Sequence, residues 1–417
     1  MKRIIGLILA LLMLAALAAC GANTEQALGG VKTLNAPAAP TEGGRSGESR
    51  VSDDFTAKSL PVMLADLNGE NRVYSPLNVY MALGMLAEIT DGESRAQVLE
   101  LLGSADMETL RAGIKALWEE CYSDGEELKL LPAASIWLRD DASYREEPLL
   151  RLAEDHRAEA FSGPMGRESY DLALRNWINE RTKHLLEQQA NELSLSPETM
   201  IALVTTLYFK SSWSSPFDED ATKKDVFHAA DGDTEADFMH DRLRRDYFRG
   251  ERFGAISIPM QRGACMWLIL PDEGVSLQEL IDSGEAAAFL SGRGEWTDRE
   301  ECSIRLSMPK FDISSDLSLN ESLQTLGVTD VFDASCADFS PLCDLRMWVS
   351  KVEHAARVMI DEEGGEAAAY TIIEMPAEAA PEIEPRVIDF VCDRPFLFAM
   401  TRWDSVLFVG AVSDPSA

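Results

Sequence analysis

The most constraining feature of this chain is residues 361–373, which lie between two strongly apolar segments. They begin with acidic residues and glycine, continue through three alanines at Ala367, Ala368 and Ala369, and end in threonine and two isoleucines. Small side chains along an extended backbone can enter a sheet between two strands, because nothing bulky must be displaced on the buried face. The segment is therefore predicted to be a strand that has not yet joined its sheet.

The alternation of side chains supports this prediction. Gly365, Ala367, Ala369, Thr371, Ile373 and Met375 share one face of an extended strand, and this face carries no charge. The other face holds Glu366, Ala368, Tyr370, Ile372 and Glu374. A disordered acidic linker would not need such sorting. We expect the uncharged face to be buried when the segment joins a sheet.

The N-terminus predicts export. Lys2 and Arg3 precede an apolar run at residues 4–17, and Leu17-Ala18-Ala19-Cys20 resembles the lipobox of bacterial lipoproteins, in which the cysteine is lipidated. We assign residues 1–19 to a lipoprotein signal peptide and residues 20–54 to lipidated Cys20 and a flexible tether. An ordinary secretory signal with a chance cysteine is the alternative. The expected location is the outer side of a cell membrane, held there by the lipid.

The charge of the chain excludes several partners. It has 38 basic and 71 acidic residues, a formal net charge of −33. Without residues 1–19 the basic residues fall to 36 and the charge becomes 36 minus 71, or −35. Because a phosphate backbone would be repelled, nucleic-acid binding is not expected. The six cysteines after Cys20 show no metal-ligand spacing, so they are predicted to be thiols in the fold, with no metal or cofactor implied.

Periodicity predicts a mixed α and β domain over residues 55–417. Helical spacing occurs at residues 79–89, 97–102, 107–118, 170–189 and 317–326. Strand patterns occur at residues 128–138, 201–209, 303–310, 349–360, 396–400 and 406–412, and a hairpin is predicted at residues 254–270. No internal repeat and no composition break appears after Ser52, so one domain is expected.

No familiar catalytic motif is present. The five histidines show no HExxH spacing, and the chain lacks a G-x-S-x-G elbow, a phosphate-binding loop and a dinucleotide fingerprint. In so acidic a chain many carboxylates are neighbours by chance, so no carboxylate pair indicates an acid/base site. The sequence therefore predicts a protein that is not an enzyme.

An ordered series of motifs resembles the serpin family over residues 55–415. The matching residues are Ser75-Pro76-Leu77, Asn176-Trp177-Ile178, Val204, Phe209-Lys210, Trp213-Ser214-Ser215-Pro216-Phe217, Met239, Ile269-Leu270-Pro271, Met308-Pro309-Lys310-Phe311, Leu326-Gly327-Val328, His354, Ile360-Asp361-Glu362-Glu363-Gly364, Asp393-Arg394-Pro395-Phe396 and Phe408-Val409-Gly410.

This resemblance implies an α+β fold with three β-sheets, eight or nine helices and an exposed reactive-centre loop at about residues 362–390. A serpin is a single-use inhibitor: a serine protease cuts the loop, the loop inserts as a strand, and the protease stays trapped as a distorted acyl-enzyme. The expected partner is a serine protease in a covalent 1:1 complex with a monomeric inhibitor. The implied hinge is Glu362, Glu363, Gly364, Gly365, Glu366, Ala367, Ala368 and Ala369. The implied sheet-opening region contains Ser75, Pro76, Thr205, Trp213 and His354.

The family spacing, counted from Glu362, places the cut bond at Glu378-Ala379, which suits a glutamate-specific protease. The stretch from Ala379 to Phe396 is longer than in familiar members, so Ala377-Glu378, which suits an elastase-like protease, is the alternative. Pro376 makes a cut after Met375 unfavourable.

Three residues depart from the family pattern. Gly365 stands where Thr or Ser is usual, Tyr370 where a small residue is usual, and Thr205 where Asn is usual. Thr205 puts in question the hydrogen bond that Asn would share with His354. A non-inhibitory member acting as a binding module on the cell surface is the alternative function, but charges or prolines would then be expected in the hinge.

Overall fold

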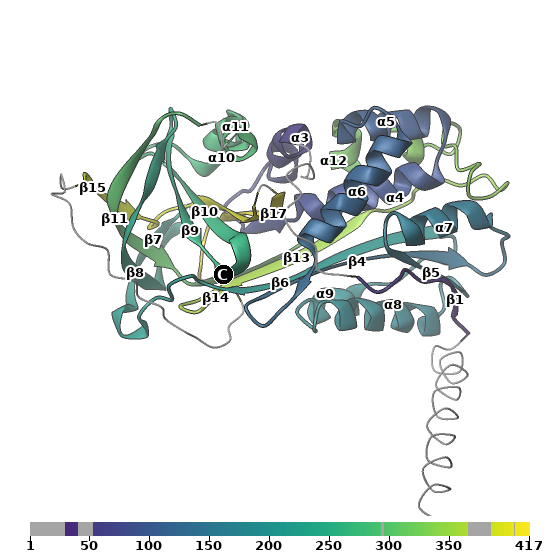
Figure 1. The fold of residues 1–417 in the computed structure, drawn as a ribbon, viewed down its shortest axis with the longest axis horizontal. Helices are drawn as coiled ribbons and strands as arrows, with labels where there is room; N and C mark the ends of the chain where they lie inside the picture. Colours follow the sequence, from purple (N-terminus) through teal and green to yellow (C-terminus); the bar gives the residue numbers. More distant parts are fainter. Residues whose placement is uncertain (1–29, 41–52, 293–295, 366–384, 404) are drawn as a thin grey trace, which may run out of the picture.

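The computed structural model describes residues 30–40, 53–292, 296–365, 385–403 and 405–417, and it confirms a mixed α and β fold (Figure 1). The α-helices of the described part are α3 (Asp53–Met63), α4 (Pro76–Ile89), α5 (Gly92–Leu102), α6 (Met107–Cys121), α7 (Glu146–Glu154), α8 (Glu168–Arg181), α9 (Glu187–Glu192), α10 (Leu277–Asp282), α11 (Glu285–Gly292) and α12 (Asn320–Thr325).

The strands of the described residues form three sheets. The first has the order β1 (Lys32–Asn35), β5 (Ala158–Gly163), β4 (Leu128–Arg139), β6 (Ile201–Ser212) and β14 (Gly364–Gly365), with β3 (Ser123–Asp124) also paired with β4. A two-stranded sheet contains β12 (Phe311–Ser318) and β13 (Glu353–Ile360).

The third sheet is the largest. Its order is β15 (Val387–Val391), β11 (Arg299–Pro309), β8 (Gly232–Arg249), β9 (Phe253–Pro259), β10 (Ala264–Pro271), β16 (Phe396–Arg402), β17 (Ser405–Val412) and β2 (Arg72–Tyr74), with β7 (Lys223–Ala229) also paired with β8. Strand β15 is parallel to β11 and forms the edge of this sheet. The long strands β4, β6 and β13 run along the long axis of the molecule, whereas β8, β9 and β11 run across it at one end (Figure 1).

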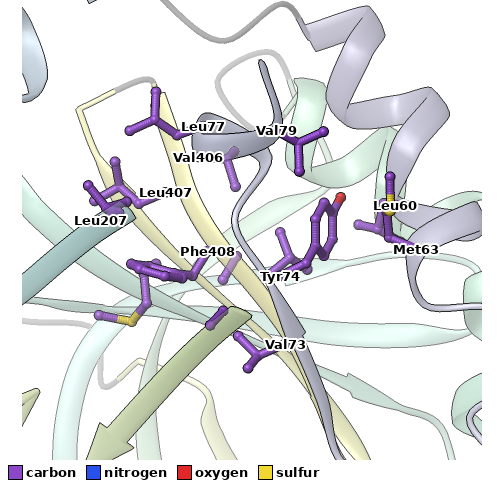
Figure 2. Packing of buried hydrophobic residues seen from close by; sticks show 14 of the residues in the cluster. Leu60, Met63, Val73, Tyr74, Leu77, Val79, Leu207, Val406, Leu407 and Phe408 are labelled. Carbon is purple, nitrogen blue, oxygen red and sulfur yellow. The ribbon is translucent and has the colours of Figure 1, made fainter. Parts of the chain in front are cut away.

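Helix α4 lies at the centre of the main core. Its N-cap Ser75 accepts a hydrogen bond from the amide of Asn78, and Pro76 occupies the first turn, where no amide donor is needed. Figure 2 shows Leu77 of this helix near Val406 and Leu407 of β17, with Leu207 of β6 next to Leu407, and Val79 on the side of Tyr74. Helix α4 contacts β6 of the first sheet and β17 of the largest sheet, so it supports the face of the first sheet that points to the main core.

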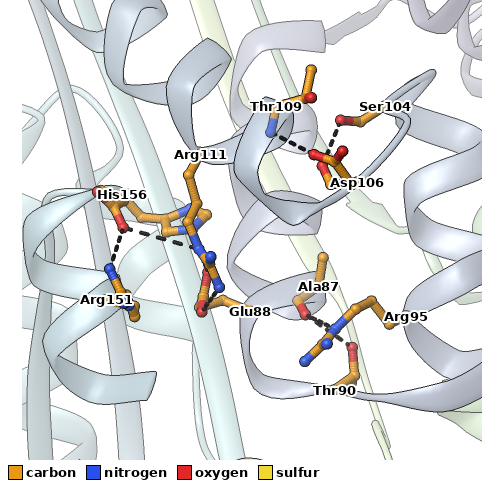
Figure 3. A network of polar contacts seen from close by, with 11 residues as sticks. Ala87, Glu88, Thr90, Arg95, Ser104, Asp106, Thr109, Arg111, Arg151 and His156 are labelled. Atoms are coloured by element: carbon orange, nitrogen blue, oxygen red, sulfur yellow. Dashed lines mark hydrogen bonds and ion pairs between the residues drawn. The ribbon is translucent and has the colours of Figure 1, made fainter. Parts of the chain in front are cut away.

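The far end of α4 carries a buried polar cluster. Arg111 of α6 donates two hydrogen bonds of 2.7 Å to the Glu88 carboxylate, and His156 Nε2 lies 3.5 Å from Glu88 Oε2 (Figure 3). Burial alone would raise the pKa of Glu88, but His156 and Arg111 together lower it to about 2. The carboxylate therefore stays ionised and joins α4 to α6.

Several predicted elements are confirmed. The segments at residues 79–89, 107–118, 128–138 and 201–209 form α4, α6, β4 and β6. The hairpin forms from β9 and β10, and its turn uses a positive φ of 55° at Arg262 and 79° at Gly263. The six cysteines of the described part are free thiols.

Other predicted boundaries were wrong. The helix expected over residues 170–189 is two helices, α8 and α9, because Lys183 and His184 adopt positive φ angles of 52° and 65° and break the helical path. The helix expected at residues 317–326 begins only at Asn320, since β12 takes the preceding residues. The strand expected at residue 349 begins at Glu353.

The prediction of a structureless tether is corrected for residues 31–35. Strand β1 pairs antiparallel with β5, with Lys32 opposite Ser162 and Thr33 opposite Phe161. The side chain of Val31 is 2% exposed and packs in the core cluster that contains Trp137. Strand β1 thus completes the outer edge of the first sheet, whereas Cys20 and residues 41–52 lie outside the described residues.

Candidate functional site

The hinge begins directly after β13 and meets the end of β6. Gly364 lies opposite Ser212 and Gly365 opposite Ser211 in an antiparallel pair, so β14 is a short first piece of a strand next to β6. The amide of Trp213 donates to the carbonyl of Glu363 at 2.9 Å. The first residues of the predicted hinge are therefore already part of the first sheet.

Trp213 and Phe217 hold the chain just before this strand. The indole Nε1 of Trp213 donates to the carbonyl of Asp361 at 2.9 Å, and the amide of Phe217 donates to the carbonyl of Glu362 at the same distance. The two rings meet edge to face at 5.7 Å, and Trp213 is fully buried. Together they fix the point from which the loop leaves the domain.

The Glu362 side chain binds two residues of other elements. Lys310 Nζ lies 2.8 Å from Glu362 Oε2, and the Thr222 hydroxyl donates to Glu362 Oε1 at 2.7 Å. Burial opposes ionisation of Glu362, but the hydrogen bonds from Lys310 and Thr222 outweigh it and lower the pKa of the carboxyl. The carboxylate anchors the hinge to the segment that follows β11 and to the turn before β7.

Gly364 occupies a conformation and a space that favour glycine. Its φ is +144°, and a Cβ there would lie 2.3 Å from the Ser211 carbonyl oxygen and 2.7 Å from the Ser212 Cα. At Gly365, by contrast, a Cβ would meet its nearest neighbour, the ring of Phe209, at 3.5 Å. The close approach of the hinge to β6 therefore depends on Gly364.

Beyond Gly365 the two strands that flank the hinge are separate. Within the described residues, β6 pairs only with β4 and β14, and β13 pairs only with β12. A cavity next to Gly365 is lined by Phe209 of β6 and by Val358, Met359 and Ile360 of β13. Among the described residues, no strand is paired between β6 and β13 beyond Gly365, and a small cavity lies there.

A second, larger cavity of about 60 Å³ lies further along the same strands. Leu203 and Thr205 of β6 line one side, His354 of β13 lines the other, and Leu83 and Leu86 of α4 form the floor. Its lining is mostly apolar, which suits small uncharged side chains entering from above.

The predicted sheet-opening residues divide into two places. Ser75, Pro76, Thr205 and His354 come together near the start of α4, whereas Trp213 belongs to the hinge at the other end of β6. His354 Nε2 accepts from the Ser75 amide at 3.0 Å, and burial lowers the pKa of His354 to about 4. The imidazole is therefore neutral at physiological pH.

Thr205 forms a hydrogen bond with α4 rather than the bond with His354 that Asn would share at this position. Its hydroxyl donates to the Asn78 carbonyl of α4 at 3.2 Å. His354 instead takes its hydrogen bond from the backbone of Ser75, whose hydroxyl donates to the Leu407 carbonyl at 2.6 Å. β6 and β13 are thus each attached to the start of α4 rather than to each other at these positions.

Other predicted site residues lie outside the described part of the chain. They are the rest of the hinge (Glu366, Ala367, Ala368 and Ala369), the residues of the two candidate cut bonds (Ala377, Glu378 and Ala379) and the lipidation residue Cys20. Their roles stay predictions.

Two anchors of the hinge were missed from the sequence. Lys310 belongs to one of the recognised motifs, but nothing in the sequence links it with Glu362, and Thr222 carries no signal of its own. Only the fold brings these three residues together.

The comparisons with known proteins agree with this geometry. The family model described as Serpin (serine protease inhibitor) matches residues 50–415. Serpin-Z2B of Oryza sativa subsp. japonica is 29% identical over 392 residues, covering 84% of this chain and 93% of that protein.

Two solved structures have a similar fold. The thermophilic serpin tengpin in its native state has a TM-score of 0.80 at 24% identity, covering 92% of this chain and 99% of that one. Human thyroxine-binding globulin complexed with its hormone has a TM-score of 0.76 at 22% identity, covering 88% and 97%. The shared fold therefore includes a protein that binds a small molecule.

Proposed function

The chain belongs to the serpin family, and from this premise we propose that it inhibits extracellular serine proteases as a suicide substrate. The observation that carries the proposal is the hinge itself. Gly364 and Gly365 are paired with the end of β6. Beyond them, the described strands β6 and β13 are not paired with each other, so a further strand could be added between them. A protein that only binds a ligand would not need a strand that has begun to pair at a position where the sheet can accept another strand.

The register of β14 supports entry of the loop in one orientation. Continued from Gly365 opposite Ser211, it would set Ala367 opposite Phe209, Ala369 opposite Leu207 and Thr371 opposite Thr205. These β6 residues face α4 and the main core, as the Thr205 hydrogen bond to Asn78 indicates. The uncharged face of the loop would thus be the buried one.

The remaining loop residues would face the α8 side of the sheet. Ala202 and Val204, which point the opposite way from Thr205, pack with the cluster that contains Trp177 of α8. Glu366 would lie opposite Lys210 in this register, so its charge gains a partner on insertion. Tyr370 would lie opposite Thr206, on the face that α8 covers rather than the face towards the main core.

The chemistry is supplied by the protease. Its serine oxygen attacks the carbonyl carbon of Glu378, the bond to the Ala379 nitrogen breaks, and the new amine leaves with the proton delivered by the protease. The ester that remains joins the two proteins. Insertion of the loop then carries the protease away from its working geometry before water hydrolyses the ester. A cut at Ala377-Glu378 would follow the same path.

The expected location completes the proposal. We infer that residues 1–19 direct export and that Cys20 carries the lipid that holds the inhibitor on the outer side of a membrane. Among the described residues, no helix is long and apolar enough to cross a membrane.

The test is incubation of the domain from residue 30 onward with elastase-like, glutamate-specific and subtilisin-like serine proteases. A complex that resists SDS is expected with at least one class, and sequencing the released C-terminal peptide identifies the cut bond. Cleavage by all classes without any complex would support the non-inhibitory alternative and reject trapping.

A matched pair of variants tests the inserted face. Ala369→Arg would place a charge on the buried face and should turn the protein into an ordinary substrate that is cut without forming a complex. Ala368→Arg, on the face towards α8, should retain more of the complex than Ala369→Arg. Equal behaviour of the two variants would contradict the proposed register.

A further inference from the structure

Strand β1 determines where the chain leaves the folded domain towards its N-terminus. Its backbone pairs with β5, and the Asn35 side-chain amide donates to the Leu149 carbonyl of α7 at 3.1 Å. Val31, just before the strand, is buried against Trp137 and its neighbours. The segment is therefore attached to both β5 and α7, and the attached part of the chain begins at about Gly30.

This attachment shortens the connection to Cys20. From Cys20 to Gly30 there are ten residues, which span at most ~36 Å when fully extended. If the connection ran free to the start of α3 at Asp53, it would have 33 residues and reach ~115 Å. A lipid on Cys20 would thus hold the β1 edge close to the membrane surface.

Strand β1 lies at one end of the long axis. Figure 1 shows β1, α7 and the first part of α8 at this end, whereas β15, which follows the reactive loop, lies at the other. We call the end formed by β1, α7 and the first two turns of α8 the anchored end. An anchor attached here directs the loop-bearing end away from the lipid.

Apolar side chains are exposed on all three elements of the anchored end. Leu34 of β1 is 44% exposed, Leu150 of α7 42% and Leu172 of α8 51%. Single exposed leucines are common on protein surfaces, but three of them on the elements nearest the inferred lipid would add apolar contact with a membrane interface. The exposed leucines are therefore a second argument for membrane contact, separate from the short connection to Cys20.

The charge of this end selects the kind of lipid. The anchored end has five carboxylates, Glu146, Glu147, Glu154, Glu168 and Asp171, and three basic side chains, Lys32, Arg151 and Arg175, so its formal charge is 3 minus 5, or −2. An anionic lipid surface would repel these carboxylates. A zwitterionic surface has no net charge, so the leucines can approach it without this electrostatic repulsion.

We propose that in the lipid-anchored protein the anchored end contacts a zwitterionic membrane surface through Leu34, Leu150 and Leu172. This contact presents the reactive loop towards the solvent, where proteases arrive. The proposal rests on the lipid anchor at Cys20 inferred above, and it does not depend on whether the protein traps proteases.

The experiment uses the full mature lipoprotein in phosphatidylcholine vesicles that contain a photoactivatable diazirine lipid. After illumination, mass spectrometry locates the labelled residues, and peptides from β1, α7 and the start of α8 should carry most of the label in the folded domain. Peptides with Val226 of β7 and Val387 of β15, 42% and 53% exposed at the other end, serve as internal controls. Equal labelling of both ends, or none on the folded domain, would overturn the proposal.

Variants test the leucines directly. The combined change Leu34→Ser, Leu150→Ser and Leu172→Ser should lower labelling of the anchored end about threefold or more. The paired control Val226→Ser with Val387→Ser should leave that labelling unchanged. Vesicles in which half of the lipid is phosphatidylglycerol should also give weaker labelling, and stronger labelling there would contradict the charge argument.

Two further outcomes separate this proposal from the inhibitory function. An intact mass without a lipid on Cys20 would overturn the proposal, because the short connection would then hold nothing. Protease trapping in solution by the domain from residue 30 onward is measured separately and can succeed whether or not the anchored end touches lipid.

Discussion

At the residue scale, Gly364 is the position at which the hinge approaches β6 most closely. We expect Gly364→Ala to lower the stability of the uncut protein by about 1–3 kcal/mol, because its Cβ would meet the Ser211 carbonyl oxygen and φ would stay positive. The thermal midpoint measured by circular dichroism checks this. Gly365→Ala, with ordinary contacts at 3.5 Å, is the matched control, and equal losses in both variants would count against the argument.

His354 makes the sheet-opening region sensitive to acid. Burial lowers its pKa to about 4 in the folded state, against about 6.5 in an unfolded chain, so the unfolded state takes up the proton first. The stability is therefore complete above pH 6.5 and is lost as the pH falls towards 4. The contribution lost by pH 5 is about 2 kcal/mol.

The measurement is the thermal midpoint at pH 7.5 and pH 5 for the natural protein and for His354→Gln. Gln can still accept the hydrogen bond from Ser75 but does not titrate. The natural protein should lose more stability between these pH values than the variant. Parallel losses would assign the acid sensitivity to other groups.

At the element scale, the hinge is held by side chains from two other parts of the molecule. Removing the charge of Lys310 by Lys310→Met should cost about 1–2 kcal/mol, because the largely buried Glu362 carboxylate loses its ion pair. The hinge should then enter the sheet without being cut, and the active fraction should fall faster on storage at 37 °C. Lys351→Met, whose ion pair with Glu353 is more exposed, is the control.

Strand β1 should stabilise the sheet edge. We expect Val31→Ser to lower the thermal midpoint, with a cost of about 2 kcal/mol from the lost apolar burial. Leu34→Ser within β1 should have little effect in solution, because that side chain is exposed. If both variants were neutral, β1 would not be stably attached.

How far the sequence predicts these elements depends on the strength of local patterns. Helix α4 and strand β6 carry long apolar patterns, so both were predicted at nearly the observed residues. Strand β1 has no such pattern, since only Val31 is buried and the pairing with β5 is made by the backbone. The break between α8 and α9 lacks a glycine or proline, because Lys183 and His184 take positive φ themselves.

The candidate site also contains residues that the sequence predicts and residues that only the fold reveals. The hinge could be found from its composition, because glycine and alanine are needed where a strand must slip between others. Its anchors Lys310 and Thr222 could not, since they lie 52 and 140 positions from Glu362 and meet it only in the fold. The separation of Thr205 from His354 likewise depends on how both strands sit on α4.

At the scale of the whole molecule, three features point in one direction. β14 is a strand that has begun to pair, the described strands β6 and β13 are not paired with each other beyond it, and apolar residues of β6, β13 and α4 line the space between them. Filling it with the loop, with its uncharged face inward, would bury apolar surface and add a strand between β6 and β13. The uncut protein is therefore expected to be less stable than its loop-inserted form.

The most direct test of this account compares thermal midpoints before and after a single cut in the loop. A protease that cuts near residues 377–379 is used, and the cut protein is purified with both of its pieces still associated. We predict that the midpoint rises well above that of the uncut protein, because the loop has become a central strand. An unchanged or lower midpoint would contradict the account, since a passive binding module gains nothing from the cut.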